Sequence, residues 1–361
     1  METSREQLTE ALGRVIDPEL KRPVTELDMV REVNVEGGHV AVTIALTVAG
    51  CPLRDSFERQ VSEHVLPLPG VESVSLAFDV MSPDERAALT KKLRGGVEPR
   101  SRGLSLDAST RVLAVASGKG GVGKSTLTAN LAAAFDRLGH RTGILDADVY
   151  GHSIPHMLGI HQRPVLVDRM IVPPVRGDLK LMSIGFFLDE NAPVMWRGPM
   201  LHKALEQFLS DVHWGELETL VVDMPPGTGD VSISLGQLLP RAEVLVVTTP
   251  QPAAQQVAVR AAQMAKKTGM RLVGAIENMS FLTGSGEELF GSGGGARLAD
   301  ELGIPLLGQV PLDPALREAA DGGDPLVWTA PEADASQAIM RIAEAVAEAH
   351  RPAFKPLPVL S

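Results

Sequence analysis

A glycine-rich segment has the residue types and spacing of a phosphate-binding loop. It reads GKGGVGKST, from Gly118 to Thr126, and follows the apolar run VLAVAS. The pattern G-x-x-x-x-G-K-[ST] between a strand and a helix surrounds phosphates with backbone N–H groups, and we expect Lys124 to reach the outer phosphates and Ser125 to bind Mg²⁺. A glycine-rich turn without a ligand is the alternative, which the complete pattern disfavours. The candidate nucleotide-binding residues here are Gly118, Lys119, Gly120, Gly121, Val122, Gly123, Lys124, Ser125 and Thr126.

Three aspartates follow other apolar runs and could supply the remaining groups for phosphoryl transfer. Asp223 ends LETLVVD, where its carboxylate could hold Mg²⁺ through water. Asp146 and Asp148 lie in ILDAD, and either could orient the attacking water. We favour Asp148, because Asp146 lies deeper in the strand register and could serve the outer shell of the metal; helix capping is the alternative for both. Together with Lys124 and Ser125, Asp223 and Asp148 predict slow, Mg²⁺-dependent ATP hydrolysis.

The sequence predicts that the elements which position these residues form an α/β fold. From Arg111 onward, short apolar runs alternate with alanine-rich helical stretches, which is typical of a parallel sheet covered on both faces. The sequence therefore predicts a P-loop NTPase fold with a mostly parallel sheet flanked by helices. Turn signals between Arg163 and Phe187 predict a hairpin inserted into the sheet order.

The first part of the chain predicts a separate, small α+β domain. Its apolar pattern is compact, and the stretch GGVEPRSRGLSLDAST after it is rich in Gly, Ser and charge, which is typical of a linker. We expect the elements of this domain to be a helix ending near Val15, strands at Val30–Val35 and Val40–Val48, a helix at Pro52–His64 and a strand at Val71–Phe78. The predicted boundaries are 1–94 for this domain, 95–110 for the linker, 111–350 for the ATPase domain and 351–361 for a C-terminal tail.

Composition disfavours several classes of partner. The 361 residues carry a net charge of −11 and no long run of Lys or Arg, which disfavours a nucleic-acid partner. The start METSREQLTEALGRVIDPEL does not resemble a signal peptide, and no apolar run approaches the roughly 18 residues of a membrane span. The last predicted helix, Ala335–His350, is too weakly basic to hold anionic lipid. We expect a cytoplasmic protein without a membrane partner.

Cysteine and histidine offer few metal ligands. Cys51 is the single cysteine, in VAGCPLRD, just before a predicted helix whose dipole would favour its thiolate. A small buried hydrophobe is the alternative for this residue. His152 and His156 could share a helix face, but no third ligand accompanies them, which favours capping and surface roles.

Several motifs together resemble a known superfamily and one family within it. GKGGVGKS, LDAD-Y-G and VVDMPPGTGD resemble the deviant Walker A ATPases, and this likeness implies a homodimer in which Lys119 reaches the nucleotide of the facing subunit. LDADVYGHSIPHMLG, VMWRGPM, TTPQ and IENMS, followed by FGSGGG, are similar to the Mrp/ApbC iron–sulfur cluster carrier family. DPEL and LTVAGCPLRDSFERQV resemble the MIP18-type domain often fused to these carriers. The likeness to the carriers covers Arg111 to about Ile342.

The resemblance implies roles for individual residues. Gly118 to Thr126 would bind ATP, Asp148 would be the switch aspartate and Asp223 the Walker B aspartate. Asn278 and Pro311 would line the adenine, with a strand-end turn as the alternative for both. Trp196 lies in a family signature, VMWRGPM, with core and interface both open. Implied partners are a second copy of the chain and apo iron–sulfur client proteins or assembly factors.

The sequence departs from the family at one place. Members usually carry a C-x-x-C pair before the FG-x-GGG loop, where two subunits supply four thiolates to one cluster, and this chain has SFLTGSGEEL there. Cys51 is then a possible iron–sulfur ligand. The leading hypothesis is an ATP-hydrolysing cluster carrier or assembly factor; the alternative is a nucleotide-switched positioning or scaffold ATPase without a cluster.

Overall fold

The computed structural model describes residues 3–48, 54–93, 106–149, 151–187 and 198–349. The chain divides into two compact units, and each is considered by itself. Unit 1 comprises residues 1–105, 163–175 and 210–215; unit 2 comprises residues 106–162, 176–209 and 216–361. Across the described residues, no helix is both long and apolar enough to cross a membrane.

Unit 1 contains a three-stranded sheet with helices. In sheet order β1-β2-β3, β1 pairs with β2 antiparallel and β2 pairs with β3 parallel. Phe57, Val61 and Val65 repeat at helical spacing on α2 and are fully buried, so α2 covers this core with one face. The last helix, α3, was not predicted. The elements are α1 (Arg5–Leu12), β1 (Val30–Glu36), β2 (His39–Leu46), α2 (Arg54–Val65), β3 (Ser73–Val80) and α3 (Pro83–Leu93).

A hairpin from the middle of the chain also belongs to unit 1. Strands β6 (Val165–Val167) and β7 (Met170–Val172) form their own antiparallel sheet. The Thr90 hydroxyl of α3 donates a hydrogen bond to the Val167 carbonyl at 3.2 Å. The predicted hairpin therefore exists, but it is a separate sheet; the next strands, β8 (Val175–Arg176) and β9 (Leu179–Ser183), join the large sheet of unit 2.

Unit 2 is built on an eight-stranded sheet, in the order β13-β12-β11-β4-β10-β5-β9-β8. Every neighbouring pair from β13 to β9 is parallel. Residues of β5, β10 and β11 are buried without exception, as expected of strands covered on both faces. The predicted parallel α/β fold is confirmed. Its other strands are β4 (Arg111–Ser117), β5 (Thr142–Asp146), β10 (Thr219–Asp223), β11 (Glu243–Thr248), β12 (Arg271–Leu282) and β13 (Leu306–Leu312).

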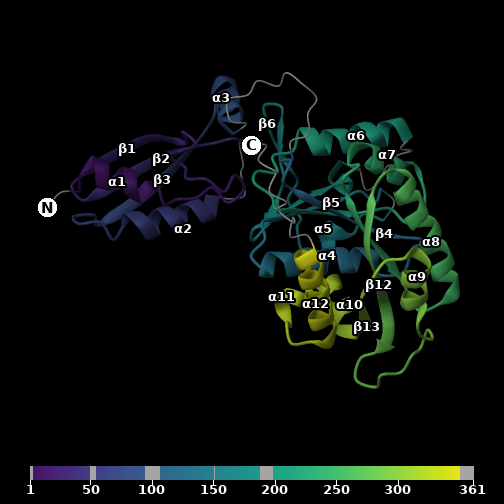
Figure 1. The fold of residues 1–361 in the computed structure, drawn as a ribbon. Coiled ribbons are helices and arrows are strands. Elements are labelled where there is room, and N and C mark those ends of the chain that lie inside the picture. Colours follow the sequence, from purple (N-terminus) through teal and green to yellow (C-terminus); the bar gives the residue numbers. More distant parts are fainter. Residues whose placement is uncertain (1–2, 49–53, 94–105, 150, 188–197, 350–361) are drawn as a thin grey trace, which may run out of the picture. The chain divides into compact units, whose positions relative to one another are not determined.

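Helices cover both faces of this sheet. The crossover from β4 through α4 moves toward β5, whereas the crossover from β11 through α8 moves the other way to β12, and right-handed crossovers in opposite directions lie on opposite faces. Figure 1 shows α12 near α4, and α9 near α8. The helices are α4 (Lys124–Arg137), α5 (Ile154–Met157), the 3₁₀ helix η1 (Ile184–Phe187), α6 (Gly198–Ser210), α7 (Asp230–Leu238), α8 (Pro252–Lys267), α9 (Gly294–Leu302), α10 (Pro314–Gly322), α11 (Leu326–Thr329) and α12 (Asp334–Ala349).

Candidate nucleotide site

The loop between β4 and α4 has the backbone shape that its glycines permit. Gly121 and Gly123 both have φ of +78°, a left-handed conformation that disfavours other residues. A Cβ on Gly118 would lie 2.2 Å from the backbone carbonyl carbon of Val257 in α8, and one on Gly123 would lie 2.3 Å from the Asn278 amide nitrogen. Gly120 and Gly121 border open space. Neighbouring elements therefore fix the two ends of the loop, and its middle is open to a ligand.

Three polar groups converge where this loop becomes α4. The Lys124 Nζ lies 2.7 Å from Asp223 Oδ2, and the Ser125 hydroxyl donates to the same oxygen at 2.7 Å. Lys124 and Asp223 are 6% and 0% exposed, so their ion pair is shielded from water. Since β4 and β10 are parallel neighbours, the residues that follow them meet at one edge of the sheet. The loop and the predicted carboxylate thus meet as the sequence predicts.

Asp146 and Asp148 lie beside this group and have different surroundings. Asp148 Oδ2 is 3.7 Å from Lys124 Nζ, and its Oδ1 accepts a hydrogen bond from the Gly151 backbone. Asp146, directly across from Asp223 in the register of β5 and β10, accepts a hydrogen bond from the Ser183 hydroxyl at 2.9 Å. Burial first, and then the Asp223 charge, raise the pKa of Asp146 to about 8. Asp148 is thus the aspartate of the pair that lies near the lysine.

The extra lysine of the loop contacts its own chain. The Lys119 Nζ donates to Gln251 Oε1 at 3.3 Å, in the turn between β11 and α8. The Thr249 hydroxyl donates to the same oxygen at 3.3 Å. The side chain is partly exposed, and within the described part of the chain its hydrogen bond is to a neutral amide, which holds it weakly.

The middle of β12 contacts two glycine-rich segments, since the strand continues past Asn278 to Leu282. Asn278 Nδ2 donates to the Val122 carbonyl of the phosphate-binding loop at 2.9 Å. The preceding Glu277, 0% exposed, accepts from the Gly295 backbone at 2.5 Å and from Gln309 Nε2 at 2.7 Å. Consecutive strand residues point to opposite faces, so these two side chains hold segments on both faces of the sheet. The buried Pro311 lies on the adjacent strand β13.

The second glycine-rich loop, residues 283–293, connects β12 to α9. A Cβ on Gly294 would lie 2.5 Å from the Pro250 carbonyl oxygen, and one on Gly295 would lie 2.6 Å from Glu277 Cβ. These glycines therefore allow the start of α9 to approach its own domain closely. Leu289 and Phe290 of the loop are 49% and 36% exposed. The loop offers hydroxyls, backbone and two glutamates, and it contains no thiolate.

Several other predicted positions lie outside the described residues or are not accompanied by further metal ligands within them. Cys51, Trp196 and Arg197 lie outside the described residues. His152 Nδ1 lies 3.4 Å from the Val149 carbonyl, and a Cβ on Gly185 would lie 2.4 Å from the His152 ring, so this histidine packs on the protein. Within the described ranges, no cluster of three or more His, Cys, Asp or Glu could hold a metal ion.

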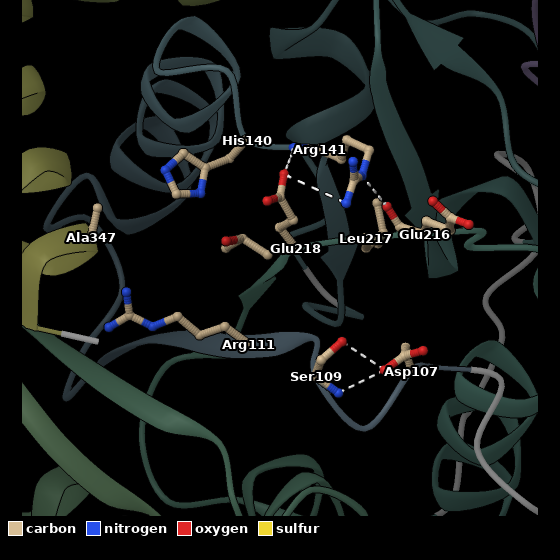
Figure 2. Close-up of a pocket in the computed structure, with 10 residues that line it drawn as sticks. Asp107, Ser109, Arg111, His140, Arg141, Glu216, Leu217, Glu218 and Ala347 are labelled. Atoms are coloured by element: carbon tan, nitrogen blue, oxygen red, sulfur yellow. Dashed lines mark hydrogen bonds and ion pairs between the residues drawn. The ribbon is translucent and has the colours of Figure 1, made fainter. Parts of the chain in front are cut away.

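A depression of about 540 Å³ lies at the other edge of the sheet, where the strands begin (Figure 2). Arg111 at the start of β4, Arg141 before β5 and Glu218 before β10 line it. Two of its charged groups are paired within the protein, since the Arg141 guanidinium lies 3.9 Å from Glu218 Oε2 and the Arg111 guanidinium donates to Glu243 Oε2 at 2.7 Å. This depression is separate from the candidate nucleotide site, which lies where the strands end.

Two buried polar residues of the site were not predicted. Thr128 donates a hydrogen bond to Asp223 Oδ1 at 2.7 Å, and Glu277 holds the start of α9. A polar residue in an otherwise alanine-rich helix was the available signal for Thr128, and a carboxylate inside an apolar strand was the signal for Glu277.

The chemistry of these donors fits a magnesium nucleotide. Hydroxyl and carboxylate oxygens are the ligands that Mg²⁺ prefers, and Ser125 Oγ lies 2.7 Å from Asp223 Oδ2. A lysine beside them and an open, glycine-lined loop suit phosphates. The parallel sheet and this site define a P-loop nucleotide-binding protein.

Comparison with known proteins gives the family. Residues 108–347 match the family described as NUBPL iron-transfer P-loop NTPase, and residues 5–76 match the iron–sulfur cluster assembly protein family. The chain belongs to the NUBPL iron-transfer P-loop NTPase family.

Relatives cover nearly the whole chain. The iron–sulfur cluster carrier protein of Mycobacterium leprae is 50% identical over 94% of this chain and 92% of its own length. The Bacillus subtilis protein of the same name is 44% identical over 85% of this chain and 88% of its own.

Among solved structures, the Archaeoglobus fulgidus nucleotide-binding protein in complex with ADP has a TM-score of 0.54 at 36% identity and covers 62% of this chain and 89% of its own. The septum site-determining protein MinD of Pyrococcus horikoshii has a TM-score of 0.51 at 24% identity, covers 66% of this chain and 96% of its own, and shares the fold.

Proposed function

We propose that this chain is a Mg²⁺-dependent ATPase that works as a homodimer to carry iron–sulfur clusters or to help assemble them. The observation that carries the ATPase part is the convergence of Lys124 and Ser125 on Asp223 within 2.7 Å at the start of α4. Family membership and relatives named iron–sulfur cluster carrier protein support the cluster part.

The site residues would divide the work of phosphoryl transfer. Backbone N–H groups from Gly118 to Gly123 would surround the phosphates, and Lys124 would neutralise their charge. Ser125 and Asp223 would hold Mg²⁺, which when bound neutralises charge between the outer phosphates. Asp148, within 3.7 Å of Lys124, would orient the attacking water. Asn278 and Pro311 would border the adenine.

Lys119 would complete the site of the facing subunit. Its single hydrogen bond to Gln251 is to a neutral amide at 3.3 Å. An ammonium group gains more from a nucleotide phosphate than from an amide oxygen, because the phosphate is charged. When the dimer closes, Lys119 would leave the Gln251 amide and bind a phosphate of the nucleotide in the facing subunit.

The cluster would need an unusual ligand set. The chain has one cysteine, Cys51, so two subunits supply two thiolates, whereas a [4Fe–4S] cluster takes four. A client or assembly factor would complete the set. The missing cysteine pair favours a second candidate function, a scaffold ATPase that binds clients without a cluster.

Anaerobic reconstitution separates these two functions. The purified chain is incubated with iron and sulfide without oxygen, desalted and assayed for iron, acid-labile sulfide and visible absorption. A carrier is expected to retain both elements and a broad absorption band, and Cys51→Ser should lose them. Wild-type protein that retains no iron would exclude direct carriage and leave the scaffold function.

A further inference from the structure

The Asp223 carboxylate is held by three side chains of α4. Lys124 and Ser125 both contact Oδ2, as described above, whereas the Thr128 hydroxyl donates to Oδ1 at 2.7 Å. The two carboxylate oxygens thus have different partners. Thr128 lies one helical turn after Lys124, on the buried face of α4.

The contact from Thr128 differs from the other two in its access to a ligand. Lys124 and Ser125 are the groups for which phosphates and Mg²⁺ would compete, so their contacts to Asp223 would change when a nucleotide binds. Thr128 is 0% exposed and lies beneath them. Its hydrogen bond is the one of the three that a bound nucleotide would leave in place.

The Thr128 hydroxyl has one proton and two acceptors in reach. Besides Asp223 Oδ1, the Lys124 carbonyl lies at 2.9 Å, the usual partner of a helical threonine. The carboxylate contact is shorter, and its acceptor belongs to the ion pair with Lys124, which makes it the stronger of the two. The proton therefore goes to Asp223, and it fixes the rotation of that carboxylate about its own axis.

The geometry points to Thr128 as a positioning residue for ATP hydrolysis: by holding Oδ1 of Asp223, it directs Oδ2 toward Ser125 and the metal. This inference rests on the metal-binding role proposed for Asp223. Loss of the hydroxyl would leave a carboxylate oxygen unpaired in a dry site, and the carboxylate would turn to find another donor. Mg²⁺ would then bind less well and turnover would fall.

The test compares two buried threonines of the same unit. Thr142 is also 0% exposed, and its hydroxyl donates to the His140 carbonyl at 3.0 Å, at the far end of the sheet. Thr128→Val and Thr142→Val each replace a buried hydroxyl with a methyl group. For each variant we would measure the unfolding free energy, the affinity for nucleotide without Mg²⁺, kcat, and the Mg²⁺ concentration that gives half-maximal turnover.

Thr128→Val is expected to lower kcat roughly tenfold or more and to raise the half-maximal Mg²⁺ concentration, with unchanged affinity for metal-free nucleotide. Thr128→Ser should restore most of kcat, because it restores the donor. Thr142→Val should lower the unfolding free energy and leave both kcat and the half-maximal Mg²⁺ concentration unchanged. If Thr128→Val does not fold, Thr128→Ala and Thr142→Ala take the place of the valine pair with the same expectations.

Wild-type kcat and Mg²⁺ dependence in the Thr128 variants would overturn the inference. Asp223→Asn tests the role on which the inference rests. If Asp223→Asn hydrolyses ATP normally, the proposed site assignment itself fails. If Asp223→Asn is inactive while the Thr128 variants are normal, the assignment stands and only the positioning role of Thr128 is lost.

Discussion

Two glycine-rich loops follow parallel strands of the same sheet, yet they are equipped for different tasks. The loop from Gly118 to Gly123 leads into Lys124, beside the Asp223 carboxylate. The loop of residues 283–293 leads into α9 and exposes Leu289 and Phe290. Both have glycines with positive φ, and both are followed by a helix. The difference lies in the side chains behind each loop, so glycine content alone does not define a phosphate site.

The glycines have similar surroundings in the two loops. In the first, Gly120 and Gly121 border open space, and Gly118 is pressed against the backbone of α8. In the second, Gly284, Gly286 and Gly291 border open space, and directly after the loop, at the start of α9, Gly294 and Gly295 are pressed against Pro250 and Glu277. Each loop thus has an open part and an anchored part. The first loop alone combines its open part with a lysine and a carboxylate.

The largest expected effect removes the lysine that distinguishes the first loop. Lys124→Ala should weaken nucleotide binding by about 100-fold or more, because it removes the phosphate partner and leaves the buried Asp223 carboxylate unpaired. Isothermal titration with ADP and ATP measures this.

Lys119→Ala is the matched control on the same loop. It should retain nucleotide binding and lose ATP-dependent dimerisation and turnover, which ultracentrifugation and phosphate release would measure. Nucleotide binding by Lys124→Ala at wild-type affinity would remove the distinction between the two loops. Unchanged turnover in Lys119→Ala would refute the role in the facing subunit.

The anchored glycines should respond alike in both loops. Gly118→Ala and Gly294→Ala each place a Cβ within 2.5 Å of backbone atoms, of Val257 and of Pro250 respectively. Displacing packed backbone costs free energy, so each substitution should lower the unfolding free energy by about 2–3 kcal/mol. Chemical denaturation followed by circular dichroism measures this loss.

Gly120→Ala provides the control, because its Cβ meets nothing within 4 Å and its φ is not in the left-handed region. It should change stability by less than about 0.5 kcal/mol. A loss in Gly120→Ala equal to that in Gly118→Ala would show that backbone conformation, and not close approach, limits the first loop.

A smaller effect concerns the pH dependence of the unfolding free energy, which involves the carboxylates beside the first loop. The pKa of Asp146 is raised to about 8 from 3.8, so the folded state favours the protonated form. Its contribution to stability is therefore fully present below pH 3.8 and is lost as the pH rises toward 8. Between pH 6 and pH 7, the unfolding free energy of the metal-free protein should fall by about 1 kcal/mol because of this group.

Asp146→Asn should abolish this part of the pH dependence, as measured by urea denaturation in the presence of a chelator. Asp148→Asn is the control, because it removes a neighbouring carboxylate. The Asp148 carboxylate lies near Lys124, whereas that of Asp146 lies near Asp223. An identical pH dependence in wild type and Asp146→Asn would show that Asp146 is ionised in the folded protein.

Local patterns predicted the parts of the molecule that depend on local backbone geometry. The phosphate-binding loop, the strand ending in Asp223 and the alternation of strands and helices all follow from short sequence spacings.

Contacts between distant segments were not predictable in this way. Thr128 and Glu277 have partners that no local pattern specifies. The hairpin β6–β7 contacts α3 in unit 1, although its neighbours in sequence belong to unit 2. Each of these contacts depends on which strands lie side by side and on which helix face is buried.

The sequence by itself therefore determined the class of site, because the loop, its lysine and its hydroxyl occupy consecutive positions whose spacing sets their geometry. Tertiary structure decided which groups stand behind that loop. The strand order places β10 beside β4 and β5 beside β10, and this brings Asp223 and Asp146 to the loop from elsewhere in the chain. It also decided that the second glycine-rich loop is anchored on Glu277 and Pro250, since close packing of α9 requires backbones without a Cβ at that contact.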